Sequence, residues 1–275
     1  MKVLISVDME GTTGVTCPDD VRPNTPGWSH FRNIMTDEAN AAIEGFLQGG
    51  ATEILVNDSH SSMRNLQIDR LHPKGTLLTG KHKRYSMMEG IDTGVDAVAY
   101  IGYHTGAGKQ GILSHTYLGN TYTGVWLNDV ECSEGYMNSL LAAEYGASIV
   151  LVTGDDLTVE DTKRYVPGVH GVAVKKCVDR YSAICLPPEV TMKAIQEAAR
   201  ESVKSITKPA KPQGPFTYRV QFDSTQPVIA ATALPFVKQT GEREVTWTLP
   251  TIQESHRAFG AVSSLVKAGI EEVYG

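Results

Sequence analysis

The sequence contains no long apolar segment, no run of basic residues and few cysteines. None of its apolar runs approaches the ~18–20 residues that a membrane-spanning helix needs. The N-terminal apolar run ends at Asp8, which is too short for the core of a secretion signal. The four cysteines, Cys17, Cys132, Cys177 and Cys185, form no CxxC pair, which is typical of free thiols in a reducing compartment. These absences predict a cytoplasmic protein with no membrane partner.

Charge and composition narrow the class of protein further. Asp and Glu number 31 against 25 Lys and Arg, a net charge of −6 that argues against nucleic acid as a partner. Of the 275 residues, 41% are hydrophobic and 20% are charged, which is typical of globular proteins and excludes disordered chains and coiled coils. The length fits one large domain, or a large domain with a small one.

In the first 207 residues, short apolar runs alternate with helical patterns. We expect strands at 2–7, 53–57, 97–101, 123–127 and 148–153, and helices near 32–48, 134–145 and 188–205. This alternation predicts an α/β domain over residues 1–207, built on a mostly parallel sheet with helices on both faces.

The C-terminal part has a different pattern. Proline occurs at every third position from Pro209 to Pro215, which favours an extended linker over residues 208–215. Residues 216–222 then alternate apolar and polar side chains, as a strand with one wet face does, and residues 245–249 repeat this. Thr251 and Glu254 have the spacing of a capping box before a helix. We therefore predict a smaller α+β lobe over residues 216–275.

Polar side chains follow the predicted strands at the point where each strand ends. They are Asp8 and Glu10, then Asn57, Asp58 and His60, then His104, and finally Asp155 and Asp156. Ligands of parallel sheets bind at the carboxyl ends of the strands. We therefore expect these side chains to lie close together.

Glu134 independently indicates a buried charged site. The predicted helix buries the face that carries Met137 and Leu141, and Glu134 lies on that face. A carboxylate in a first helical turn interacts favourably with the helix dipole, but a buried one is unfavourable unless it is paired or bound to a metal. Because imidazoles and carboxylates are predicted nearby, we interpret Glu134 as part of a metal site.

The number of candidate ligands indicates more than one ion. The five candidates are Asp8, Glu10, His60, His104 and Glu134. One catalytic zinc typically takes roughly three ligands from the protein, whereas two ions about 3.5–4 Å apart share a bridging carboxylate. The absence of thiolates from this set argues against a structural zinc.

Seven short motifs then occur in an order that resembles a known family. They are SVDMEG at residues 6–11, MTDEAN at 35–40, VNDSH at 56–60, LHP at 71–73, GYH at 102–104, SH at 114–115 and GDD at 154–156. With these motifs the sequence resembles the binuclear zinc D-aminopeptidases, of the type encoded with dipeptide transport systems. One departure follows His104, where the family's usual Ala-Arg-Ala is Thr105-Gly106-Ala107.

The resemblance implies a role for each candidate residue. Asp8 would bridge two zinc ions. Glu10 and His60 would complete one site, and His104 and Glu134 the other. His115 would be the catalytic histidine beside the metals. The resemblance also implies two zinc ions per subunit, a short peptide substrate and a ring-like homo-oligomer such as a decamer.

Glu131 is the alternative to Glu134, because residues 130–133 diverge from the family pattern. Asn57 and Asp58 are expected to orient His60. Asp155 and Asp156 either orient His115 or cap a helix that begins near Leu157. We expect His30, His82, His170 and His256 to be surface or capping residues, and His72 to order a turn.

Two other functions compete with the aminopeptidase. DMEGT at residues 8–12 resembles the Asp-x-Asp-Gly-Thr loop of haloacid-dehalogenase-type phosphatases, in which Asp8 would be the nucleophile and magnesium the cofactor. That interpretation leaves His60, His104 and His115 without a role.

A non-enzymatic α/β binding module is the second alternative to the aminopeptidase. The turn GTTG at residues 11–14 could hold a phosphate, although it lacks a Walker lysine and a dinucleotide fingerprint. We therefore predict a metallo-aminopeptidase that removes the N-terminal residue of short peptides, including D-amino-acid peptides.

Overall fold

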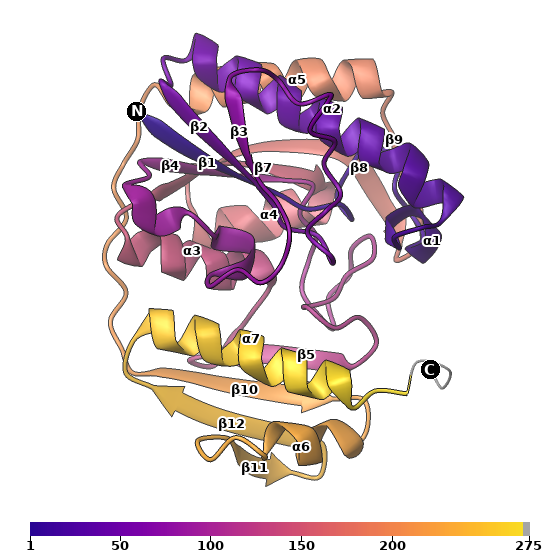
Figure 1. The fold of residues 1–275 in the computed structure, drawn as a ribbon, viewed down its shortest axis with the longest axis vertical. Coiled ribbons are helices and arrows are strands. Elements are labelled where there is room, and N and C mark those ends of the chain that lie inside the picture. Colours follow the sequence, from indigo (N-terminus) through magenta and orange to yellow (C-terminus); the bar gives the residue numbers. More distant parts are fainter. Residues whose placement is uncertain (272–275) are drawn as a thin grey trace.

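The computed structural model describes residues 1–271, which form two sheets with helices packed against them (Figure 1). The last residues of the predicted lobe, 272–275, lie outside the described residues. Sheet A has the strand order β3-β2-β1-β4-β7-β8-β9. Its strands are β1 (Lys2–Val7), β2 (Glu53–Asp58), β3 (Gly75–Leu78), β4 (Ala97–Ile101), β7 (Ser148–Asp155), β8 (His170–Asp179) and β9 (Ser182–Cys185). All neighbours are parallel except β8 and β9, which form an antiparallel hairpin at one edge.

Helices cover both faces of sheet A, because its strands alternate their apolar side chains between two core clusters. On one face, Val3 and Ile5 of β1 pack in the cluster that contains residues of α2 (Pro26–Gln48) and α5 (Pro188–Ser202). On the other, Leu4 belongs to the cluster that contains residues of α3 (Glu134–Glu144) and α4 (Asp156–Tyr165). Figure 1 shows these two layers above and below the sheet. The predicted fold class is confirmed. None of the helices within residues 1–271 has both the length and the apolar character needed to cross a bilayer.

Sheet B forms the smaller lobe with α7 (Ile252–Ala268) and α6 (Gln226–Ala231). Its order is β11-β12-β10-β5-β6, and all its pairings are antiparallel. The strands are β5 (Tyr122–Leu127), β6 (Val130–Glu131), β10 (Phe216–Phe222), β11 (Lys238–Gly241) and β12 (Glu244–Leu249). Tyr218 and Trp247 stack in its core beside Phe259 of α7. Thr251 caps α7 by accepting a hydrogen bond from the Glu254 amide, as its spacing predicts.

The strand predicted at 123–127 is β5, but its assignment to the parallel sheet is wrong. β5 pairs antiparallel with β10, with Val125 opposite Val220 and Leu127 opposite Tyr218. A short apolar run predicts a strand without indicating which sheet accepts it, because the partner comes from a distant segment. The short helix α1 (Pro18–Val21) and the hairpin β8–β9 were not predicted. The division of the chain into domains at residues 208–215 stays a prediction.

Candidate metal centre

Three of the predicted ligands follow neighbouring strands in the middle of sheet A. Asp8 comes directly after β1, His60 follows β2, and His104 follows β4. Strands β2, β1 and β4 are adjacent and parallel. Because their carboxyl ends meet at one edge, the three side chains converge there. Gly11 permits the close approach of the first loop, since a Cβ at this position would collide with the Tyr103 carbonyl oxygen.

The two oxygens of Asp8 face two different imidazoles. Oδ1 of Asp8 lies 3.2 Å from Nδ1 of His60, and Oδ2 lies 3.4 Å from Nε2 of His104. A carboxylate in this orientation can join two separate groups of ligands.

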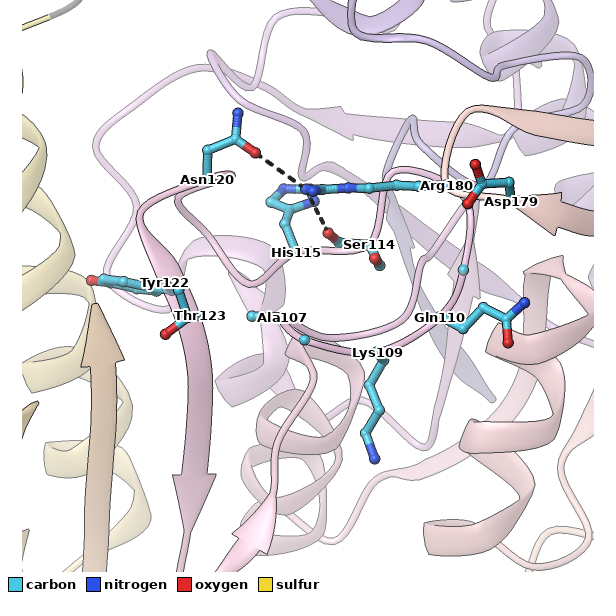
Figure 2. A pocket seen from close by; sticks show the side chains of 12 residues that line it. Ala107, Lys109, Gln110, Ser114, His115, Asn120, Tyr122, Thr123, Asp179 and Arg180 are labelled. Carbon is cyan, nitrogen blue, oxygen red and sulfur yellow. Dashed lines mark hydrogen bonds between the residues drawn. The ribbon is translucent and has the colours of Figure 1, made fainter. Parts of the chain in front are cut away.

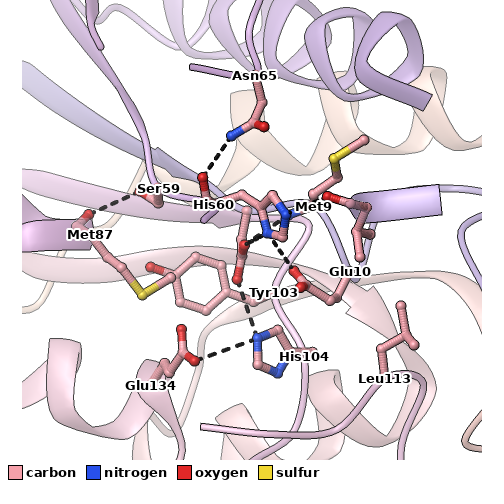
Figure 3. A network of polar contacts seen from close by, with 12 residues as sticks. Met9, Glu10, Ser59, His60, Asn65, Met87, Tyr103, His104, Leu113 and Glu134 are labelled. Atoms are coloured by element: carbon pink, nitrogen blue, oxygen red, sulfur yellow. Dashed lines mark hydrogen bonds and ion pairs between the residues drawn. The ribbon is translucent and has the colours of Figure 1, made fainter. Parts of the chain in front are cut away.

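Glu10 and Glu134 complete these two groups. Oε2 of Glu10 lies 3.0 Å from Nδ1 of His60, and Oε1 of Glu134 lies 3.7 Å from Nε2 of His104. Dashed lines in Figure 3 join both pairs. All five side chains are buried. The structure thus places Glu10 and His60 on one side of Asp8, and His104 and Glu134 on the other.

Backbone contacts determine which ring nitrogen of each histidine faces the carboxylates. The His60 Nε2–H donates to the Val21 carbonyl at 2.9 Å, and the His104 Nδ1–H donates to the Thr105 carbonyl at 2.9 Å. The opposite nitrogens, Nδ1 of His60 and Nε2 of His104, are therefore the ones available to a cation. Such contacts orient histidine ligands in metal sites.

The structure separates Glu134 from Glu131. Glu134 is the first residue of α3, which Ser133 caps, and its Oε1 accepts a 2.7 Å hydrogen bond from the Tyr117 amide. Glu131 is exposed in β6 and forms an ion pair with Lys109. Only Glu134 faces the cluster.

His115 lies against the cluster with its ring stacked on His104. The ring centroids are 4.2 Å apart with 9° between the planes. The His115 Nδ1–H donates to the Leu113 carbonyl at 2.8 Å, which leaves Nε2 facing Glu10, 3.9 Å from its Oε1. Burial, followed by the neighbouring charge of His104, lowers the pKa of His115 to about 4. The ring is therefore neutral near pH 7, and its Nε2 can accept a proton.

The loop that carries His115 is held from two sides. Asp155 Oδ2 accepts a 2.6 Å hydrogen bond from the Ile112 amide, and Arg180 Nη2 donates to the Ser114 carbonyl at 3.1 Å. Asp155 also caps α4, because its Oδ1 accepts from the Thr158 amide at 2.7 Å. Asp155 therefore caps a helix, one of the two roles that the sequence left open for it, and also holds the His115 loop through the Ile112 amide.

The buried carboxylates depend on positive charge in the cluster. Burial disfavours ionisation of Asp8, but hydrogen bonds from His104 and His60 outweigh it and lower the pKa of the Asp8 carboxyl well below its usual range. Burial raises the pKa of Glu134 to about 7 despite the charge of His104. Burial opposes protonation of His104, yet Glu134 and Asp8 raise its pKa to about 10. A bound cation would supply this positive charge directly.

The donor set fits a divalent transition-metal ion. Ligand atoms of Asp8, Glu10 and His104 lie within 4.8 Å of one another, and so do those of His104, His115 and Glu134. Imidazole and carboxylate donors without thiolates are typical of catalytic zinc sites.

Two lysines that sequence reasoning missed support the loops of the cluster: Lys175 is buried and Lys83 is half-buried. Nζ of Lys175 donates to three carbonyl oxygens in the loop after β1, among them that of Glu10 at 2.7 Å. Nζ of Lys83 donates at 2.6 Å to the Asn57 side chain and to the Asp58 carbonyl. No sequence pattern marks these lysines, because their acceptors come from distant segments.

The remaining predictions near the cluster have mixed outcomes. Asp58 acts on His60 through Asn65, whose Nδ2–H₂ donates to the Asp58 carboxylate at 2.8 Å and to the His60 carbonyl at 2.7 Å.

The prediction that His256 is a surface or capping residue is wrong. His256 is buried, and its Nε2–H donates to the Tyr85 carbonyl at 3.3 Å. The expected surface histidines, His30, His82 and His170, are exposed.

The cluster lines a cavity of about 770 Å³, whose other walls include residues 81–84 and one face of α7. His115 also lines a second cavity of about 490 Å³, which contains Asn120 and Arg180 (Figure 2). A cavity of the first size can hold a small organic ligand. An α/β enzyme with a candidate metal centre at its strand ends is the class that this geometry defines.

The chain belongs to the D-aminopeptidase family (Peptidase_M55), whose model matches residues 1–261. A D-aminopeptidase of Bacillus subtilis (strain 168) is 32% identical over 276 residues, covering 96% of this chain and 97% of the relative. The solved structure of the Zn-dependent D-aminopeptidase DppA from Bacillus subtilis, described as a self-compartmentalizing protease, has a TM-score of 0.93 at 30% identity and covers 97% of this chain and 98% of that chain. The predicted family is therefore confirmed and the chain is a hydrolase. Neither the phosphatase nor the non-enzymatic module is favoured.

Proposed function

We propose that this hydrolase is a two-zinc aminopeptidase that removes the N-terminal residue of short peptides, with D-residues among its substrates. The observation that carries this proposal is the orientation of Asp8, whose oxygens face two separate groups of imidazole and carboxylate donors. Zinc and D-residue specificity are supported by the Zn-dependent D-aminopeptidase from Bacillus subtilis that this chain resembles.

The charge of the cluster favours two ions over one. Asp8, Glu10 and Glu134 contribute three buried carboxylates, so one divalent ion would leave a net negative charge in the site. Two divalent ions together with one hydroxide ion would leave the site neutral. A buried site is most stable when its charges are compensated in this way.

In the proposed reaction, Asp8, Glu10, His60, His104 and Glu134 hold the two zinc ions. Bound zinc would polarise the scissile carbonyl and activate a water molecule. The neutral Nε2 of His115 faces the cluster and would accept a proton from this water and pass it to the departing amine, a general acid–base role. The cavity beside the cluster has the size of a short peptide.

We further propose a ring-like homo-oligomer in the cytoplasm. The assembly is supported by the relative described as a self-compartmentalizing protease. It is also supported by exposed apolar side chains on the β8–β9 hairpin. The location is supported by the four cysteines, all of which are free thiols.

Release of the N-terminal residue from paired peptides tests the activity. D-Alanyl-D-alanine should yield free D-alanine faster than the L,L-dipeptide yields L-alanine. A chelator should abolish the release, and zinc but not magnesium should restore it. Release that persists in the chelator, or no release from either peptide, would contradict the proposal.

A further inference from the structure

The cavity beside the metal cluster is lined by charges of one sign beyond the cluster itself. Among the described residues, the only carboxylates that line it are Asp8, Glu10 and Glu134, all candidate ligands. Six basic residues line it as well: Arg22, Lys81, Lys83, Arg84, Arg257 and Lys267. A chain whose net charge is −6 therefore concentrates positive charge in one cavity, and such a cavity attracts anions.

Three of these basic side chains have partners that explain their position. Arg22 forms an ion pair with Asp19. Nζ of Lys83 donates to three acceptors, and the Arg84 guanidinium lies 4.9 Å from the centre of the Tyr85 ring. Lys81, Arg257 and Lys267 differ, because within residues 1–271 the side chains of these three form no ion pair with a carboxylate, no hydrogen bond and no cation–π contact.

Lys81 and Lys267 reach the cavity from different parts of the chain. Lys81 lies in the segment after β3, and Lys267 in the last turn of α7. Burial, followed by the charges of Lys267 and Arg64, lowers the pKa of Lys81. Two ammonium groups close enough to repel each other are stabilised when an anion lies between them.

The wall of the cavity that α7 forms leaves room for a peptide. Gly260, Ala261 and Ser264 of α7 line it, and a Cβ on Gly260 would meet no heavy atom within 4 Å. The cavity thus has both the metal cluster and basic residues in its lining, with small side chains on its α7 wall. A short peptide has groups for both, an amine that the metal cluster can bind at one end and a carboxylate that basic residues can bind at the other.

We propose that Lys81 and Lys267 bind the terminal carboxylate of the peptide whose amino end faces the metal cluster. The inference rests on the proposed function, because it assumes a peptide in this cavity. With this contact, the enzyme would prefer peptides that have a free carboxyl terminus. Short peptides would then be selected by this charge as well as by their size.

Equilibrium binding tests this role separately from hydrolysis. The probes are D-alanyl-D-alanine and its C-terminal amide, titrated into the zinc-loaded His115→Ala protein, in which turnover is slow. The peptide should bind roughly 10- to 100-fold more tightly than the amide, the usual effect of a hydrogen-bonded charge. Substituting both lysines, Lys81→Met with Lys267→Met, should remove this preference. Lys193→Met, on exposed α5 surface away from the cavity, should keep it.

The wild-type enzyme provides the second readout. Its KM should be lower for the peptide than for the amide, and the double substitution should raise KM for the peptide only. Lys81→Glu should reverse the preference in favour of the amide. Equal affinity for both probes, or a preference that survives the double substitution, would overturn the inference. If the wild-type enzyme hydrolyses neither probe but still prefers the carboxylate, the proposed function fails and the inference stands.

Discussion

Two carboxylates only three positions apart in the sequence, Glu131 and Glu134, have opposite surroundings. Glu134 is buried beside His104, whereas Glu131 is exposed and paired with Lys109. Glu134→Gln replaces a charged donor by a neutral amide of the same shape and should reduce the bound zinc by about half. Glu131→Gln is the matched control and should keep full zinc content. Elemental analysis of the two purified variants checks this, and the reverse pattern would assign the ligand to Glu131.

The position of His115 predicts a catalytic defect without loss of metal. Its Nε2 lies 3.9 Å from Glu10, and its Nδ1 is held by the Leu113 carbonyl. His115→Ala should keep both zinc ions and the fold, because the five other donors remain. Turnover should fall roughly 10²–10⁴-fold, the usual effect of losing a positioned acid–base group. A variant that lost zinc would show His115 to be a ligand, and unchanged turnover would exclude it from the mechanism.

The residues of the cluster could be predicted from sequence because strand ends converge at one edge of a parallel sheet. Asp8, His60 and His104 each follow a strand that the apolar pattern reveals. Lys175 and His256 could not be found in this way. Their burial depends on contacts with segments far away in the chain, and neither residue stands in a pattern that shows such contacts.

At the scale of elements, Asp155 couples the start of α4 to the loop that carries His115. Asp155→Ala removes a helix cap and leaves the Ile112 amide without its acceptor. The free energy of unfolding should fall by about 2–4 kcal/mol, and turnover should fall with it because the His115 loop loses an anchor.

Thr251→Ala provides the control for this variant. It removes the cap of α7 and should cost about 1 kcal/mol with turnover unchanged. Denaturant unfolding and steady-state kinetics on both variants separate the effects. If Asp155→Ala lost stability but kept normal turnover, its contact with the loop would have no catalytic role.

The elements that were predictable have a periodic pattern of their own. In β10, Phe216, Tyr218 and Val220 are buried while the side chains between them are only partly buried, as period-two alternation predicts. Strand β8 has no such regularity, because exposed and buried positions follow each other unevenly along it. β5 shows a further limit: its apolar run predicts a strand, but only the tertiary fold brings β10 beside it.

At the scale of the whole molecule, the edge of sheet A bears an apolar surface. Val178, Tyr181 and Ile184 of the β8–β9 hairpin are 54%, 50% and 63% exposed, and β9 is an edge strand. Exposed edges and apolar patches of this kind favour association. We expect this hairpin to contact a second copy of the chain.

Ile184→Lys should therefore reduce the molar mass of the assembly measured by light scattering, because it places a charge in the contact. Ile229→Lys is the control, since Ile229 of α6 is 76% exposed but lies on a different element. A monomeric wild-type protein would contradict the proposed assembly. Dissociation by Ile229→Lys alone would place the contact on the other lobe.

Titration of zinc into the metal-stripped protein tests the central proposal most directly. Release of D-alanine from D-alanyl-D-alanine is followed against the zinc added per chain, for the wild type and for Asp8→Ala. Because the oxygens of Asp8 face both ligand groups, the wild-type activity should rise until two equivalents are bound, and Asp8→Ala should gain neither zinc nor activity. Full wild-type activity at one equivalent, or an Asp8→Ala protein that still binds two, would contradict the account.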